Sequence, residues 1–204
     1  IGWTGLLLPW IVWVAAWSYE NSLSGYYYTR ANVLFTGILI LCGVFLISYK
    51  GYQKKEEKIS DNIITWIAGI LILIVVAIPA QYNDFASGDC PTPVCHGNAL
   101  LGGIHFGCAA IFLVAIGYLS IFNFTRGNKP FTEGKIKRNR IYRICGYGMW
   151  VTLGVAGIML FILNMGERWP RLILWVEIID LLFFGVSWLV KGKALSGLGI
   201  LNED

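Results

Sequence analysis

The stretch GKIKRNRIYR at residues 134–143 leads directly into ICGYGMWVTLGVAGIMLFILNM at residues 144–165. An apolar run of this length matches the ~20 residues that a helix needs to cross ~30 Å of hydrocarbon. Basic residues beside such a run stay on the cytoplasmic side of the membrane. The stretch therefore predicts a membrane-spanning helix that enters from the cytoplasm.

Further apolar runs of similar length occupy residues 3–17, 32–49, 63–81, 99–122 and 172–190. The runs are continuous rather than alternating, which favours helices over a β-barrel. The first run lacks a basic leading region and a small-residue cleavage site, so we expect it to remain as a span. With 56% apolar and 14% charged residues, the chain is more apolar than a usual soluble domain. We predict an all-α membrane protein, a bundle of six transmembrane helices forming a single domain over residues 1–204.

The basic residues divide unevenly between the two sides of this pattern. Thirteen of the 16 Lys and Arg residues fall in the second and fourth connections and in the tail. They are Lys50, Lys54, Lys55, Lys58, Arg126, Lys129, Lys135, Lys137, Arg138, Arg140, Arg143, Lys191 and Lys193. The other connections hold Arg30, Arg168 and Arg171. The imbalance predicts that both termini are cytoplasmic.

The third connection contains the run Cys90-Pro91-Thr92-Pro93-Val94-Cys95-His96, together with Asp84 and Asp89. On the outer side of a membrane, the two cysteines are expected to form a disulfide. Two alternatives stay open. One is covalent haem attachment, although four residues rather than the usual two separate the cysteines. The other is a metal site of Cys90, Cys95 and His96 with His105 as a fourth ligand. We expect no cofactor.

Three ionisable residues lie inside the apolar runs, where each costs a few kcal/mol unless it faces protein or water. They are His105, Glu177 and Asp180. His105 and Glu177 each lie about two turns from the outer end of their helix, and Asp180 follows Glu177 by three residues on nearly the same face. All three belong to the outer half of the bundle.

The first connection brings more polar side chains to the same depth. They are Tyr26, Tyr27, Tyr28, Arg30 and Asn32. Together with His105, Glu177 and Asp180 they predict an outward-facing polar pocket. In it, Arg30 and His105 could neutralise Glu177 or bind an anionic headgroup. The alternative is an internal network that fixes the register of the helices and binds no ligand.

Basic residues near the span ends are expected to contact anionic lipid at ~1 kcal/mol each. The candidates are Lys50, Lys137, Arg138, Arg140, Arg143 and Lys191. Nucleic-acid binding is set aside, because the basic run ends in a membrane span.

Small residues predict where two of the helices touch. Gly103 and Gly107 form a GxxxG step in the fourth run, and Gly154, Ala156 and Gly157 form a similar notch in the fifth. We expect the two helices to pack closely at these residues.

Several blocks resemble a family of bacterial six-span proteins without an assigned activity. They are Ser22-Leu23-Ser24-Gly25-Tyr26-Tyr27-Tyr28-Thr29, Ile104-His105-Phe106, Arg138-Asn139-Arg140-Ile141-Tyr142-Arg143-Ile144-Cys145-Gly146 and Phe184-Gly185-Val186-Ser187-Trp188-Leu189-Val190-Lys191-Gly192. The first block is also distantly similar to six-span proteins of the DRAM type. The resemblance implies a six-helix fold in a bacterial inner membrane and no particular reaction. It also implies that Tyr27, Arg30, His105, Arg140, Tyr142, Arg143, Glu177 and Lys191 are the positions to test first.

Three functions fit these observations. The first is binding or sensing of a lipid headgroup or small amphiphile in the outer pocket. The second is a channel or carrier with Glu177 and Asp180 on the ion or proton path, and the third is an enzyme with His105 as general base beside Glu177. Phosphate-binding, serine-hydrolase and zinc-protease motifs are absent from the sequence. The expected partners are membrane lipids, with a homo-oligomer or a larger membrane assembly as further options.

Overall fold

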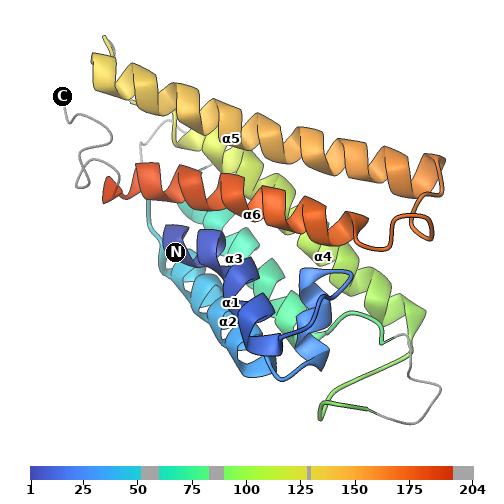
Figure 1. The fold of residues 1–204 in the computed structure, drawn as a ribbon. Coiled ribbons are helices and arrows are strands. Elements are labelled where there is room, and N and C mark those ends of the chain that lie inside the picture. Colours follow the sequence, from blue (N-terminus) through green and yellow to red (C-terminus); the bar gives the residue numbers. More distant parts are fainter. Residues whose placement is uncertain (52–59, 83–89, 128–129, 195–204) are drawn as a thin grey trace.

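The computed structural model describes residues 1–51, 60–82, 90–127 and 130–194. All regular structure in these residues is helical, which confirms the all-α prediction (Figure 1). The elements are α1 (Gly2–Ala16), the 3-10 helix η1 (Leu23–Tyr28), α2 (Asn32–Ser48), α3 (Asp61–Ala77), α4 (Ala99–Tyr118), the π-helix η3 (Leu119–Asn123), α5 (Glu133–Gly157), the π-helix η4 (Ile158–Ile162) and α6 (Leu172–Lys191). Lys54, Lys55, Lys58, Lys129, Asp84 and Asp89 lie outside the described residues.

Three of the helical stretches are long and apolar enough to cross a membrane. They run from Ala99 to Asn123, from Glu133 to Ile162 and from Leu172 to Lys191, with mean hydropathies of 2.2, 1.7 and 2.0. The helices α1, α2 and α3 are also apolar but shorter, at 15, 17 and 17 residues. A 17-residue helix is ~26 Å long, close to the thickness of the hydrocarbon core.

The helices form a closed ring in which each packs against its neighbours in the sequence. α1 also packs along α6, which joins the two ends of the series. The interior contains apolar side chains from each of the helices α1 to α6, among them Leu8, Phe35, Ile72, Phe112 and Phe184. Two ends of the bundle can be distinguished. We call the end that carries Lys50, Arg126, Lys135 and Lys191 the basic end, and the end that carries η1 and the Cys90–Cys95 segment the loop end.

Two helix boundaries differ from those expected. α5 begins at Glu133 rather than near residue 144, so the basic run is itself helical. Its start is capped by the Thr132 hydroxyl, which accepts a hydrogen bond from the backbone N–H of Lys135 at 3.2 Å. α3 ends at Ala77 rather than near residue 81, because Pro79 has no N–H with which to continue the helix.

The close contact between α4 and α5 lies elsewhere than predicted. A Cβ atom added at Gly146 would lie 2.7 Å from the carbonyl oxygen of Gly117, so the two backbones touch there. A Cβ atom added at Gly103, Gly107, Gly154 or Gly157 would meet no atom within 4 Å. The prediction for those glycines is therefore wrong. The two helices meet toward the basic end and diverge toward the loop end (Figure 1).

Candidate functional site

His105 joins three elements at the loop end. Its Nδ1 lies 3.1 Å from the carbonyl oxygen of Val75 and 2.7 Å from that of Ile78, and its Nε2 lies 2.8 Å from Ser24 Oγ. Because Nδ1 faces two acceptors, it carries the proton, and in the neutral ring Nε2 then accepts a hydrogen bond from the Ser24 hydroxyl. The Val75 carbonyl needs this donor, since its helical partner would be the N–H that Pro79 lacks. His105 is 5% exposed, and both ring nitrogens are engaged.

Glu177 connects α6 to η1. Its Oε2 accepts a hydrogen bond from the backbone N–H of Leu23 at 2.6 Å. This N–H is at the start of the 3-10 helix, where a carboxylate satisfies a donor that the helix leaves unpaired. Within the described part of the chain, no cationic side chain contacts Glu177. The Arg30 side chain instead donates from Nε to the carbonyl oxygen of Ala16 at 3.0 Å. The expected pairing of Arg30 with Glu177 is therefore corrected.

His105 and Glu177 line the same cavity of about 390 Å³ between α4, α5, η4 and α6. We call it the α4–α6 cavity. It occupies the space where α4 and α5 diverge. Its polar lining consists of Ser22, Ser24, Gln81, His105 and Glu177. Its apolar lining includes Phe106, Ala109, Ala110, Leu113, Val114, Leu153, Ala156, Gly157, Leu160, Phe161, Ile173 and Val176. A cavity with apolar walls and a few polar groups is typical of small-molecule sites.

The tyrosines and Asn32 lie outside the α4–α6 cavity, which corrects the expectation that they share it. The Tyr26 hydroxyl donates to the carbonyl oxygen of Ser18 at 3.2 Å, and that of Tyr28 donates to the carbonyl oxygen of Ala80. Asn32 Nδ2 donates to the carbonyl oxygen of Tyr27. Burial, with smaller contributions from Tyr27 and Tyr82, raises the pKa of Tyr28 to about 12, so its hydroxyl stays protonated. These side chains fix the first connection against its neighbours.

Asp180 also lies outside the cavity, although it follows Glu177 by one turn of α6. It is 0% exposed, and neither carboxylate oxygen has a hydrogen-bond partner within the described residues. An ionised carboxylate in such surroundings is costly, and a proton or a cation reduces that cost.

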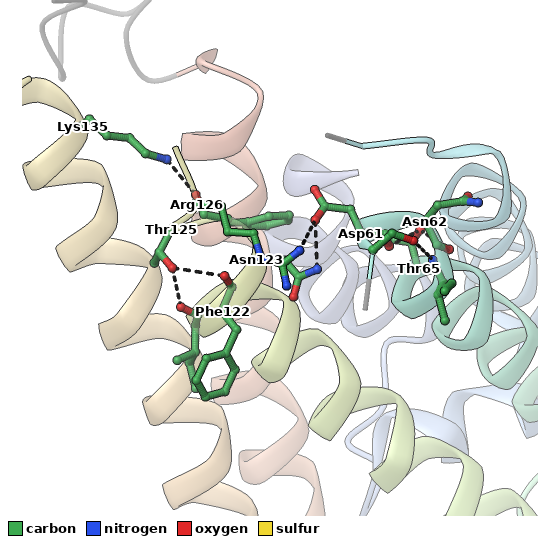
Figure 2. Close-up of polar contacts among 12 residues, drawn as sticks. Asp61, Asn62, Thr65, Phe122, Asn123, Thr125, Arg126 and Lys135 are labelled. Atoms are coloured by element: carbon green, nitrogen blue, oxygen red, sulfur yellow. Dashed lines mark hydrogen bonds and ion pairs between the residues drawn. The ribbon is translucent and has the colours of Figure 1, made fainter. Parts of the chain in front are cut away.

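A second polar cluster lies at the basic end, and its residues are not among those predicted from the sequence to form a site. Asp61 is 1% exposed; its Oδ1 accepts a hydrogen bond from Asn123 Nδ2 at 2.9 Å and lies 3.8 Å from Arg126 Nη1. Figure 2 shows Asn123 and Arg126 both directed at this carboxylate. Nearby, Lys135 Nζ donates to the carbonyl oxygen of Phe124 at 2.9 Å. A signal was available, because Asp61 and Asn123 are polar residues directly beside apolar runs.

The six candidate contacts for anionic lipid separate into two groups. Lys50 and Lys191 line a cavity together at the basic end. Lys137, Arg138, Arg140 and Arg143 lie within the first turns of α5, where all but Arg138 are exposed.

Cys90 and Cys95 form a disulfide with a Cα–Cα distance of 6.1 Å, as predicted. The metal and haem alternatives need free thiols, which this bond consumes. His96 Nε2 lies 2.9 Å from the carbonyl oxygen of Pro79, and His105 is engaged as described above. These contacts tie the disulfide segment to the end of α3.

The comparisons with known proteins found no relative of this chain. No protein-family model matches the chain, and neither a curated protein nor a solved structure matches it.

Proposed function

We propose that the chain is a membrane protein that binds or senses a lipid headgroup or small amphiphile in the α4–α6 cavity. The observation that carries this proposal is the composition of the cavity wall. Apolar side chains from α4, α5 and α6 suit a hydrocarbon tail, and Ser22, Ser24 and Glu177 at one end suit a polar head. Because Glu177 has no cationic partner among the described side chains, a headgroup with an ammonium or hydroxyl donor fits best.

We further propose six spans with both termini in the cytoplasm of a bacterium, and membership of the six-span family that the sequence blocks resemble. Large apolar side chains exposed on several helices support burial in lipid, for example Val33 at 77%, Leu41 at 68% and Phe161 at 71%. The gathering of Lys50, Arg126, Lys135 and Lys191 at one end supports the orientation. Membrane lipids are then the immediate partners, with self-association or a larger assembly as further options.

Blocking the α4–α6 cavity should weaken binding. The probe is a phosphatidylethanolamine with a photoreactive diazirine in one acyl chain, added to nanodiscs that contain the protein. Both Gly157 and Gly154 have open space at the Cβ position, but only Gly157 lines the cavity. We expect Gly157→Phe to reduce crosslinking to residues 102–114 and 153–161 about tenfold, equal to ~1.4 kcal/mol of binding free energy.

Gly154→Phe is the matched control, since it adds the same side chain one turn earlier on α5 and should leave crosslinking unchanged. Crosslinking is read by peptide mass spectrometry. Equal labelling of the Gly157→Phe variant and the unmodified protein would show that the probe binds elsewhere, and the proposal would fail.

A carrier of protons or cations is the second candidate, and the isolation of Asp180 favours it. Glu177 is accessible from the cavity, and Asp180 lies one turn deeper without a hydrogen-bond partner in the described structure. Two carboxylates in this order could pass a proton or cation along α6. The enzyme hypothesis, with His105 as general base, is less well supported. The histidine Nε2 contacts the Ser24 hydroxyl, but a nucleophile there would need free backbone N–H groups to stabilise an oxyanion, and those of Leu23 and Gly25 are already bonded to Glu177 and to Ser22 Oγ.

Flux through liposomes tests the carrier candidate. If the carboxylates form the path, the double variant Glu177→Gln with Asp180→Asn should reduce proton or sodium flux to the level of empty liposomes. Glu167→Gln removes one carboxylate from the segment between η4 and α6 and should transport normally. Flux that persists in the double variant would rule out this role for the two residues.

A further inference from the structure

The basic end contains a cavity that is independent of the proposed amphiphile site. It has a volume of about 570 Å³ and lies between the end of α2 and the end of α6. Its lining residues are Phe45, Ser48, Tyr49, Lys50, Gly51 and Lys191. Lys50, just after α2, and Lys191, at the end of α6, therefore line one space although they are distant in the sequence.

Gly51 brings Lys50 to this position. Its φ is +59°, and a Cβ atom there would lie 2.3 Å from Cβ of Asp61. Only glycine can therefore let the chain turn against the start of α3. Tyr49 supports the turn, since its carbonyl oxygen accepts a hydrogen bond from Thr65 Oγ1 at 3.2 Å.

Lys191 is held by an aromatic cluster. Its Nζ lies 4.8 Å from the centroid of the Phe124 ring, a cation–π geometry. Trp188, one turn earlier on α6, packs edge-on against Phe124 and Tyr49 at centroid distances of 5.2 and 5.1 Å. The ammonium group is therefore positioned by packing before any ligand arrives, which lowers the entropic cost of binding.

Among the described residues, positive charge exceeds negative charge around the cavity. Asp61 attracts Lys191, but the same carboxylate pairs with Arg126 and accepts from Asn123 (Figure 2). Lys135 adds another cation, which is repelled by Lys191 and Arg138. Within the part of the chain that the structure describes, the one buried carboxylate of this cluster, Asp61, is thus outnumbered by the cations Arg126, Lys135, Lys191 and Lys50. An anion entering the cavity would relieve this repulsion.

We propose that this cavity binds a phosphate group, with the ammonium groups of Lys50 and Lys191 as its cationic ligands. Phosphate suits compact ammonium donors, and Phe45, 43% exposed beside them, offers apolar contact to an attached chain. The Ser48 hydroxyl donates to the carbonyl oxygen of Val44 at 2.8 Å, so the lysines provide the principal contacts. The phosphate group can belong to a phospholipid of the adjacent leaflet or to a soluble compound.

Two binding assays on the full chain distinguish these sources. The first titrates inorganic phosphate into detergent-solubilised protein by calorimetry. The second counts bound phosphatidic acid by native mass spectrometry, with phosphatidylcholine as the zwitterionic reference. Binding in the first assay indicates a site open to soluble phosphate, and binding in the second alone indicates a lipid headgroup. Binding in neither assay overturns the proposal.

Variants distinguish a specific phosphate site in this cavity from general attraction of anions to the basic surface. Lys50→Gln and Lys191→Gln should each weaken binding about tenfold, as expected for loss of one charge-assisted contact. Lys137→Gln removes the same charge from an exposed position on α5 that does not line this cavity. It should weaken phosphate binding less than about twofold, and phosphatidic acid binding less than either cavity variant does. Lys191→Arg keeps the charge and tests whether the loss of binding in Lys191→Gln reflects misfolding. Lys50 is exposed, so its replacement leaves the packed interior intact. A loss for Lys137→Gln equal to that for Lys50→Gln would refute the site.

Discussion

Replacing Gly146 with valine should destabilise the protein by about 3 kcal/mol, because α4 and α5 have no room for a side chain where they touch. The Cβ atom would lie 2.4 Å from Ile121 Cγ1 and 2.7 Å from the backbone oxygen of Gly117. A side chain can rotate away from such a clash, but a backbone oxygen moves only if the whole helix moves. We therefore expect α4 and α5 to separate toward the basic end.

Gly154→Val is the control for this experiment. It places the same β-branched residue in the same helix, at a position where the new Cβ atom meets nothing within 4 Å. Both variants therefore share the change in helix propensity and differ in packing. Thermal unfolding in nanodiscs should show a clear loss for Gly146→Val and little change for Gly154→Val. Similar unfolding temperatures for the two variants would contradict the contact between Gly117 and Gly146.

Replacing His105 with alanine should lower the free energy of unfolding by about 3–5 kcal/mol. The change removes the donor to Val75 and Ile78 and the acceptor of the Ser24 hydroxyl. These groups would remain buried without partners, and Pro79 prevents the chain from supplying an N–H to Val75. The loss is read from denaturant or thermal unfolding of the purified protein.

Two variants with smaller expected losses of unfolding free energy serve as references for His105→Ala. Ser24→Ala removes one of the hydrogen bonds and should cost about 1 kcal/mol. His96→Ala removes the contact to Pro79 in a partly exposed segment and should have a similarly small effect. If His105→Ala unfolds no more easily than His96→Ala, the histidine does not anchor the loop end.

The all-α fold and approximate helix positions could be predicted because continuous apolar runs are a strong local signal. The run at residues 172–190 corresponds to α6 almost residue for residue, since helix formation there depends on the segment itself. The start of α5 is harder to predict, because Lys, Arg and Glu are good helix formers and the polar stretch before residue 144 continues the helix. The disulfide of Cys90 and Cys95 was predictable because both partners lie in one short segment.

Contacts between helices were harder to predict. The sequence presents Gly103, Gly107, Gly154 and Gly157 as small-residue notches no less clearly than Gly117 and Gly146. Which pair meets depends on how α4 and α5 cross, and that is set by the packing of the other helices. The same reason explains why the structure places His105 and Glu177 at one cavity, whereas the predicted contact of Arg30 with Glu177 is replaced by a hydrogen bond to Ala16. Depth follows from position along a helix, whereas partners depend on rotation about it.

The separation of α4 and α5 has a consequence for how such a protein can change over generations. The contact at Gly117 and Gly146 admits no side chain, whereas the walls around Gly157 and Ala156 end in empty space. Mutations at the first place would be removed by selection on folding, and mutations at the second would alter the volume and shape of the cavity while the bundle stays intact. The same helical bundle can therefore accommodate cavities of different shape without losing stability.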